Sequence, residues 1–136
     1  MRIQILLHCL LSLSTLGVVV PSASGQGNLK VAIRDDNNCE ANSVDVSYIL
    51  SFWNKNSHLI FVARIGDGEQ SSRQNLRRLT NIKTAFGDLI PKDKLVLAQG
   101  ERTKGRGRVE AYVNGQLFII FTVGKNENLR IGNCTN

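Results

Sequence analysis

Histidine and cysteine are scarce in this sequence, and their scarcity limits the chemistry that the chain can perform. The 136 residues include two histidines and three cysteines. His8 lies in the apolar N-terminal stretch, so His58 is the one histidine of the remaining chain. No Cys, Asp or Glu lies close to His58, and neither Cys39 nor Cys134 has a second Cys or His nearby. The sequence therefore indicates no metal site and no Ser-His-Asp arrangement.

Other active-site patterns are absent as well. The chain has no Gly-x-Ser-x-Gly turn and no pair of carboxylates set between apolar runs. The segment Gly66-Asp67-Gly68-Glu69 lacks the alternating oxygen ligands of a calcium loop. Internal repeats and low-complexity segments are also missing. We expect a protein that is not an enzyme and that needs no cofactor or metal.

Acidic residues are outnumbered, with 11 Asp and Glu against 17 Lys and Arg, which gives a net charge of +6. A basic exported protein is attracted to anionic partners such as cell-wall polymers, lipid head groups or acidic glycans, although the charge can also serve solubility alone. Residues 102–108 concentrate four of the cations. They form either an anion-binding loop or a solvated loop. Since no aromatic residues accompany them, we expect no nucleic-acid partner.

The N-terminus is typical of a secretory signal peptide. A short positive start, Met1-Arg2, precedes an almost wholly apolar run over 3–20, and Pro21 ends that run. Ala23-Ser24-Gly25 supplies the small residues that a signal peptidase reads. The alternative is a marginal transmembrane anchor. We expect cleavage after residue 25, a single domain over 26–136, and no transmembrane segment after processing.

Cleavage leaves two cysteines, Cys39 and Cys134. An even pair in an oxidising compartment predicts one disulfide, which closes a loop of nearly the whole domain. Two free thiols or a metal pair are the competing interpretations, and the lack of neighbouring ligands argues against the metal. The location is expected to be periplasmic or secreted.

Hydrophobic periodicity predicts an α/β (α+β) domain with the order β-α-β-α-β-β-β. The strongest signal is Asn114-Gly115 between two alternating runs, which is typical of a two-residue hairpin. Asn42 is expected to cap the first helix. Leu76, Leu79, Ile82 and Phe86 are expected to form the apolar face of the second. The strand over 59–65 is expected to be buried on both faces. The predicted strands are 28–33, 59–65, 95–98, 109–113 and 117–121, and the predicted helices are 43–54 and 69–86, followed by a polar tail from Gly124.

Four segments, taken in order, resemble the OmpA-like peptidoglycan-binding family. Residues 59–67 are similar to its strand with a Gly-x-Thr-Asp turn, and 75–79 are similar to its Leu-Ser-x-Arg-Arg-Ala helix start. Residues 90–101 are similar to its Ile-Pro-x-x-Lys strand with Gly-x-Gly-Glu, and 106–113 to its Arg-Arg-Val-Glu-Ile strand. The resemblance implies an OmpA-like βαβαβ core with a mixed sheet, two helices and an added C-terminal hairpin.

The resemblance also implies a ligand. In that family an Asp and an Arg hold the carboxylate and amine of diaminopimelate in the peptidoglycan stem peptide, and the matching positions here are Asp67 and Arg78. Arg73 and Arg77 would add positive field. The connection between Asp67 and Arg78 is shorter than usual, Gly66 stands where the family has Thr, and the family's Asn has no clear counterpart. The implied function is an exported envelope domain that binds peptidoglycan or another anionic polymer. The alternative is a degenerate member with a structural or protein–protein interaction role among envelope proteins.

Overall fold

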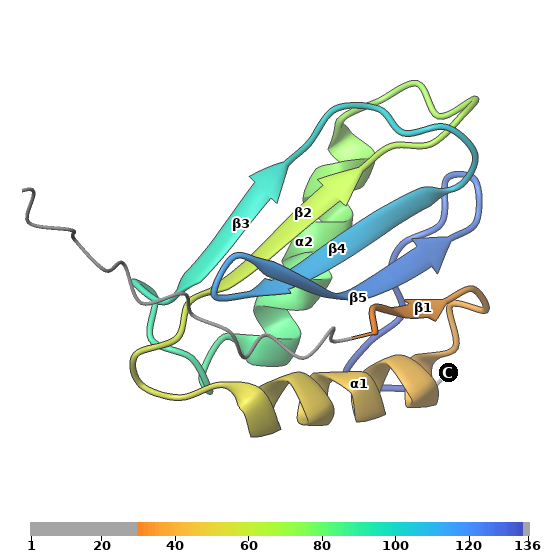
Figure 1. Cartoon of the computed structure of the whole chain (residues 1–136). Coiled ribbons are helices and arrows are strands. Elements are labelled where there is room, and N and C mark those ends of the chain that lie inside the picture. The colour runs from red at the N-terminus through yellow and green to blue at the C-terminus, as the bar shows by residue number, and fades with distance from the viewer. Residues whose placement is uncertain (1–29, 135–136) are drawn as a thin grey trace, which may run out of the picture.

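A computed structural model describes residues 30–134, and it shows a five-stranded mixed sheet with two helices (Figure 1). The α/β prediction and the element order are confirmed. The elements are β1 (Ala32–Arg34), α1 (Cys39–Phe52), β2 (Leu59–Arg64), α2 (Arg73–Phe86), β3 (Leu95–Gln99), β4 (Gly107–Val113) and β5 (Gln116–Val123).

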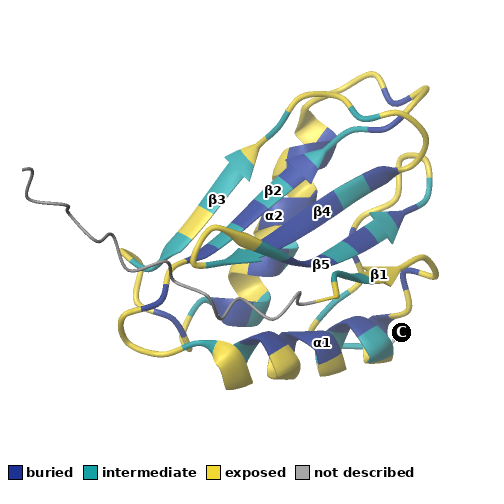
Figure 2. Cartoon of the chain, in the orientation of Figure 1, coloured by how far each residue is buried: buried dark blue, intermediate teal, exposed yellow. Residues whose placement is uncertain are grey.

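The sheet has the strand order β1-β5-β4-β2-β3. β1 pairs with β5 in parallel, β2 pairs with β3 in parallel, and the β2–β4 and β4–β5 pairs are antiparallel. Phe61 of β2 is buried in one core with Ile49 of α1 and Phe86 of α2. Both helices therefore pack on the same face of the sheet. In Figure 2 the buried side of α1 faces the sheet and its exposed side faces away.

The prediction that the strand over 59–65 is buried on both faces is wrong. Leu59, Phe61 and Ala63 are buried, whereas the alternate residues Ile60 and Val62 are only half-buried. The reason is that, among residues 30–134, both helices lie on the first face and no helix covers the second. β2 is thus a strand with one covered face and one open face.

Helix α1 begins one turn earlier than predicted, and Asn42 is not its cap. The N-cap is Asn38, whose side chain accepts a hydrogen bond from the N–H of Ala41 at 2.9 Å. Asn42 lies inside the helix and is buried, and its side-chain amide donates to the carbonyl of Arg130 at 2.8 Å. Both Asn38 and Asn42 could cap a helix. Asn38 does so, whereas Asn42 instead binds the tail after β5.

Helix α2 begins at Arg73 rather than at residue 69, so Glu69 lies in the preceding loop. Leu79, Ile82 and Phe86 are buried as predicted, but Leu76 is 52% exposed. Its expected place on the buried face is taken by Arg78, which is fully buried. The first turns of α2 therefore bury polar side chains and leave an apolar one in solvent.

The hairpin prediction is confirmed. Asn114 and Gly115 join β4 to β5 with φ values of 51° and 79°, the left-handed backbone that a two-residue hairpin turn needs. The Asn114 side chain also accepts a hydrogen bond from the N–H of His58 at 3.1 Å. The turn residue thereby also holds the start of β2.

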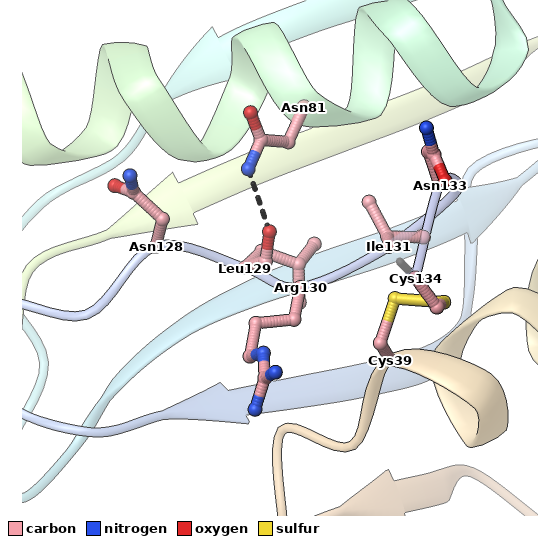
Figure 3. Close-up of a pocket in the computed structure, with 8 residues that line it drawn as sticks. All are labelled: Cys39, Asn81, Asn128, Leu129, Arg130, Ile131, Asn133 and Cys134. Carbon is pink, nitrogen blue, oxygen red and sulfur yellow. Dashed lines mark hydrogen bonds between the residues drawn. A yellow bond between two sulfur atoms is a disulfide. The ribbon is translucent and has the colours of Figure 1, made fainter. Parts of the chain in front are cut away.

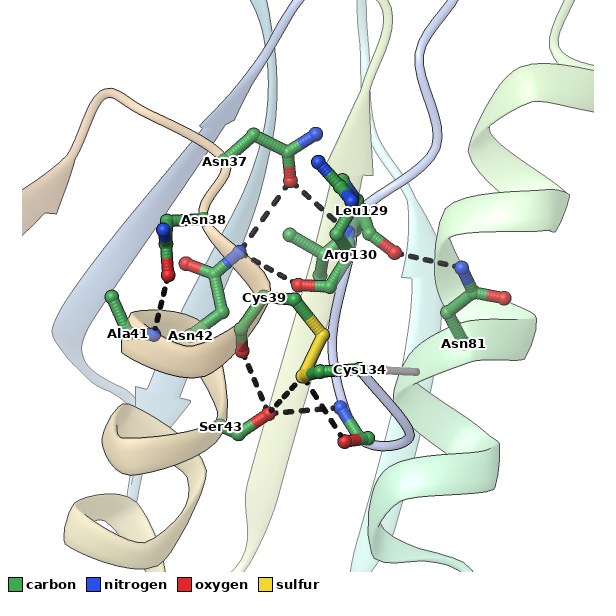
Figure 4. The surroundings of a disulfide bond; sticks show 11 residues. Asn37, Asn38, Cys39, Ala41, Asn42, Ser43, Asn81, Leu129, Arg130 and Cys134 are labelled. Carbon is green, nitrogen blue, oxygen red and sulfur yellow. Dashed lines mark hydrogen bonds between the residues drawn. A yellow bond between two sulfur atoms is a disulfide. The ribbon is translucent and has the colours of Figure 1, made fainter. Parts of the chain in front are cut away.

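The predicted polar tail after β5 packs against the domain. Leu129 is fully buried in the main core. Asn81 of α2 donates to the Leu129 carbonyl at 2.7 Å, and Asn42 of α1 donates to the Arg130 carbonyl at 2.8 Å. The tail therefore lies between the two helices and bridges them (Figure 4).

The predicted disulfide between Cys39 and Cys134 is present and joins the start of α1 to the end of this tail (Figure 4). The two residues are 95 apart in sequence and 5.6 Å apart at Cα. Ser43 ties the same corner together, since its hydroxyl donates to the Cys39 carbonyl and accepts from the N–H of Gly132. The bridge thus closes a loop that contains every other described element except β1.

The predicted signal peptide, 1–25, lies outside the described residues, as do positions 28 and 29 of the first predicted strand. Between residues 30 and 134, no helix has the length and apolarity needed to cross a bilayer.

Candidate functional site

Arg78, one of the two central residues of the predicted ligand site, is fully buried. Its two terminal nitrogens contact the Glu69 carboxylate at 2.5 and 3.1 Å. Nε and Nη2 also donate to the carbonyl of Glu127, and Nη1 donates to the carbonyl of Arg64. Every N–H group of the guanidinium therefore has an acceptor within the chain. A ligand carboxylate would have to displace Glu69 to reach it.

Glu69 is as well satisfied as its partner. It is 1% exposed, and it also accepts hydrogen bonds from the N–H groups of Gly66 at 2.7 Å and Asn126 at 2.8 Å. Burial acts to raise the pKa of this carboxyl. The hydrogen bonds from Arg78, Gly66 and Asn126 outweigh burial and leave the pKa below its ordinary value. Glu69 is therefore an ionised, internal counter-ion for Arg78.

Gly107 makes room for this pair, and Gly66 makes room for the backbone of Gly107. A Cβ on Gly107 would lie 2.6 Å from both the Glu69 carboxylate and the Arg78 guanidinium, and a Cβ on Gly66 would lie 2.3 Å from the backbone nitrogen of Gly107. Gly107, in the basic loop over 102–108, is thus required by packing. The glycines of this loop are visible in the sequence, but the sequence alone does not show that Gly107 is the one that faces Glu69 and Arg78.

We predict that Gly107→Ala lowers the free energy of unfolding by about 1–3 kcal/mol, the usual cost of forcing atoms into a filled site. The added methyl group would push Glu69 and Arg78 apart. Urea unfolding followed by circular dichroism measures the effect, and Lys104→Ala in the neighbouring exposed loop is the control. Equal stability of the two variants would show that the pair tolerates separation.

Asp67, the other central residue of the predicted site, has a different environment. It is exposed, and its carboxylate accepts a hydrogen bond from the N–H of Gly105 at 2.7 Å. The Asp67 N–H donates in turn to the Gly105 carbonyl. Asp67 therefore fastens the β2–α2 loop to the β3–β4 loop, whereas Arg78 is bonded to Glu69. The structure does not join Asp67 and Arg78 in one polar site.

Arg73 and Arg77 lie exposed on α2, as expected for outward-facing residues.

Near the start of α2, the β2–α2 loop and the segment after β5 enclose a polar hollow. Lys125 is the one formally charged residue in its lining. Gln74 in its wall donates to the Glu127 carbonyl at 2.8 Å, so the same segment that Arg78 holds also shapes the hollow. The lining residues are Gly68, Gln70, Ser71, Gln74, Lys125 and Asn126.

The basic loop over 102–108 is largely occupied by its own contacts. Arg102 donates to the carbonyls of Gly66 and Glu69, and Arg106 donates to the carbonyl of Asp35. These contacts tie the loop to backbone carbonyls of the β2–α2 loop and of the segment after β1. They favour the interpretation of a structural loop over that of an anion-binding loop.

A second buried carboxylate, Glu110, lies on the open face of the sheet. It accepts hydrogen bonds from Arg64 at 3.0 Å, Arg108 at 2.7 Å and the Tyr112 hydroxyl at 2.8 Å. Burial acts to raise the pKa of Glu110, but Tyr112, Arg64 and Arg108 outweigh it and leave the pKa lowered. Burial and Glu110 together raise the pKa of Tyr112. This network is charge-compensated within the sheet.

These lowered pKa values predict loss of stability in acid. Glu69 and Glu110 have folded-state pKa values below their ordinary value of 4.5, so the unfolded chain binds protons first as the pH falls. The stabilisation is complete above about pH 5.5 and is lost progressively as the pH falls through the folded pKa values. Urea midpoints measured between pH 3 and pH 6 test this prediction. Glu110→Gln should flatten the profile, while Glu101→Gln, at an exposed position, should not.

An apolar groove runs between α2 and the edge strand β3. Two adjoining hollows, which share Lys83 and Leu97 in their linings, make up this groove. Its lining is mainly aliphatic, and Lys83 and Lys92 supply its only formal charges. The lining residues are Leu76, Leu79, Thr80, Lys83, Gly87, Ile90, Lys92, Leu95, Leu97 and Gln99.

A further hollow lies beside the disulfide, lined by the tail and by Asn81 of α2 (Figure 3). Asn81 uses its side-chain amide to hold the carbonyl of Leu129. The hollow therefore lies where the tail contacts α2 and the disulfide. Residues 30–134 contain no group of three or more His, Cys, Asp or Glu side chains placed to hold a metal ion.

No family model matches the chain, and no curated protein or solved structure matches it. The OmpA-like resemblance thus stays a prediction drawn from four short segments. The groove between α2 and β3 is the surface that sequence reasoning missed. The sequence offers no signal for it, because Leu76 has the same spacing as the buried residues of α2 and its exposure is seen only in the structure.

Proposed function

We propose that the chain is an exported, non-catalytic domain of the cell envelope that acts by binding another envelope protein. The observation that carries the proposal is the apolar groove beside a sheet edge that has no partner strand within residues 30–134. Leu76 in the groove is 52% exposed, and Val96 on the same edge strand is 43% exposed. Exposed apolar surface of this kind marks sites of protein contact in soluble domains. The N-terminal sequence and the disulfide both favour a periplasmic or secreted location.

The state of Arg78 favours a protein partner over the wall peptide that the family resemblance implies. Its donors are all used by Glu69 and by carbonyls, and breaking a buried ion pair costs about 3–5 kcal/mol. A ligand carboxylate would have to recover that cost before it gained any affinity. The Glu69–Arg78 pair instead holds the segment after β5.

Position-specific cross-linking in the producing cell tests the proposal. A photo-reactive amino acid is placed in the full-length protein at four exposed apolar positions: Val44, Leu76, Leu89 and Val96. We expect a protease-sensitive adduct of discrete mass at some of these positions and none at the others. A complete lack of protein adducts, together with sedimentation on cell wall, would overturn the proposal.

A second candidate function, binding of peptidoglycan stem peptide, is favoured by one observation. The polar hollow with Lys125 lies beside the β2–α2 loop that carries Asp67. Lys125 can pair with a ligand carboxylate, and Gln70 and Gln74 can supply amide contacts. The exported protein is incubated with insoluble peptidoglycan and sedimented, alongside Lys125→Ala and Asp67→Asn. Arg78 is left intact because its removal would perturb the fold.

The expected result is that the protein stays in the supernatant. Pelleting that is lost in Lys125→Ala or Asp67→Asn, but kept in Lys104→Ala, would establish the wall-peptide function instead. Lys104 is a matched control, since it is an exposed lysine in the neighbouring loop.

A further inference from the structure

We infer that the groove between α2 and β3 binds an extended peptide segment with acidic residues, which adds to β3 as a sixth strand. The inference rests on the proposed function, because it names the chemistry of the protein partner. It combines an unprotected sheet edge, an apolar groove beside that edge, and the charge of the groove.

β3 is the last strand in the order β1-β5-β4-β2-β3, so one of its sides has no partner strand within residues 30–134. Toward β2, the Lys94 carbonyl accepts from Leu59 and the N–H of Gly100 donates to Ala63, each at 2.9 Å. Backbone groups of a strand alternate between its two sides. The N–H and C=O groups of Leu95, Leu97 and Gln99 therefore face outward, ready to pair.

The two sheet edges are protected to different degrees. β1 spans three residues and ends in Arg34, so it offers little backbone to another chain. β3 spans five residues, Leu-Val-Leu-Ala-Gln, with no charge, no proline and no bulge. Proteins commonly protect their edges with such features because an open apolar edge pairs with other chains. The lack of a charge, a proline or a bulge in β3 is therefore consistent with an edge strand that pairs with a strand of another molecule.

The groove can accept the side chains of an added strand. Leu95 and Leu97 line it from β3, and Leu76 lines it from α2. Alternate side chains of a strand laid along β3 would point toward the helix side and cover these leucines. The remaining side chains would point to the open face near Val96. The fitting segment therefore alternates apolar residues with residues that tolerate solvent.

Charge selects the partner. Lys83 and Lys92 line the groove and no carboxylate does, although Asp93 adjoins it in sequence. A second copy of this chain, paired edge to edge, would bring both sets of lysines together on a protein of net charge +6. An acidic segment would instead pair with them. Charge complementarity therefore favours an acidic peptide over self-association.

The test uses a fluorescein-labelled nonapeptide in which valine and threonine alternate between paired terminal aspartates. Its binding to the full exported protein is followed by fluorescence anisotropy, and the binding site is followed by amide hydrogen exchange. We expect a dissociation constant in the micromolar range and slower exchange at the N–H groups of Leu95, Leu97 and Gln99. The same peptide with lysine in place of aspartate should bind at least about tenfold more weakly.

Two sets of variants separate strand addition from simple charge attraction. Gln99→Pro removes an outward N–H without removing a bond to β2, so it should abolish binding, whereas Gln99→Ala should not. Circular dichroism and urea unfolding check that Gln99→Pro remains folded. Exchanging both groove lysines, Lys83→Glu with Lys92→Glu, should reverse the preference between the two peptides.

Three outcomes would overturn the inference. The first is no binding of the aspartate peptide up to about 1 mM, the weakest affinity of interest here. The second is equal binding by Gln99→Pro and Gln99→Ala. The third is a dimer in sedimentation velocity that Gln99→Pro dissociates, which would make a second copy the occupant. If photo-cross-linked protein adducts still form at Val44 or Leu89 in that case, the proposed protein-binding function stands, but the groove between α2 and β3 is not its site.

Discussion

Replacing Arg78 by methionine is expected to lower the free energy of unfolding by about 3–5 kcal/mol, the usual cost of removing one partner of a buried ion pair. The loss arises because Glu69, which is 1% exposed, would lose its counter-ion while it stays buried. The carbonyl of Glu127 would lose two donated hydrogen bonds as well. Urea unfolding of the purified protein measures the change.

Arg77→Met is the matched control, since Arg77 is the preceding residue on the same helix and is exposed. It should change stability by less than about 0.5 kcal/mol, as exposed substitutions usually do. Adding Glu69→Gln to Arg78→Met should cost less than the sum of the two single changes, because the uncompensated charge is then gone. Strict additivity would mean that the two side chains are not coupled.

Removal of the disulfide is expected to have the other large effect. Cys39→Ala with Cys134→Ala opens a loop of 95 residues, for which the chain-entropy estimate is about 4–5 kcal/mol. Wild-type protein unfolded in the presence of a reductant should approach the same stability. The comparison uses urea midpoints together with the dependence of free energy on urea concentration, because an open loop also changes the unfolded chain.

A loss below about 1 kcal/mol would contradict this prediction, since it would mean that the tail is held by its other contacts alone. Those contacts are the buried Leu129 and the hydrogen bonds from Asn42 and Asn81. Asn81→Ala in the disulfide-bonded protein measures their share. It should cost about 1–3 kcal/mol, because the carbonyl of Leu129 would then lack its donor.

The sequence predicted the parts of the fold that local chemistry decides. The turn at Asn114-Gly115 was readable because two adjacent residues with positive φ have a narrow set of sequences. The Cys39–Cys134 bridge was readable because only one pair remained after the expected cleavage. The order of helices and strands followed from periodicity in the same way.

Features that depend on tertiary contact were not predictable. Asn38 and Asn42 have equal capping ability, and only the approach of the tail decides which one is drawn into the interior. Glu69 was predicted to begin the second helix, because no neighbouring residue shows that its carboxylate forms an ion pair with Arg78. The open second face of β2 likewise depends on where the helices settle. Each wrong prediction concerns a hydrogen-bond partner, or a packing helix, that is distant in the sequence.

The position of the tail has a consequence for biogenesis. Leu129 completes the core and Cys134 completes the covalent loop, yet both belong to the last part of the described chain to be synthesised. A nascent polypeptide that lacks them has two helices with nothing bridging them and a reduced Cys39. It therefore remains incompletely folded until Leu129 and Cys134 have been synthesised.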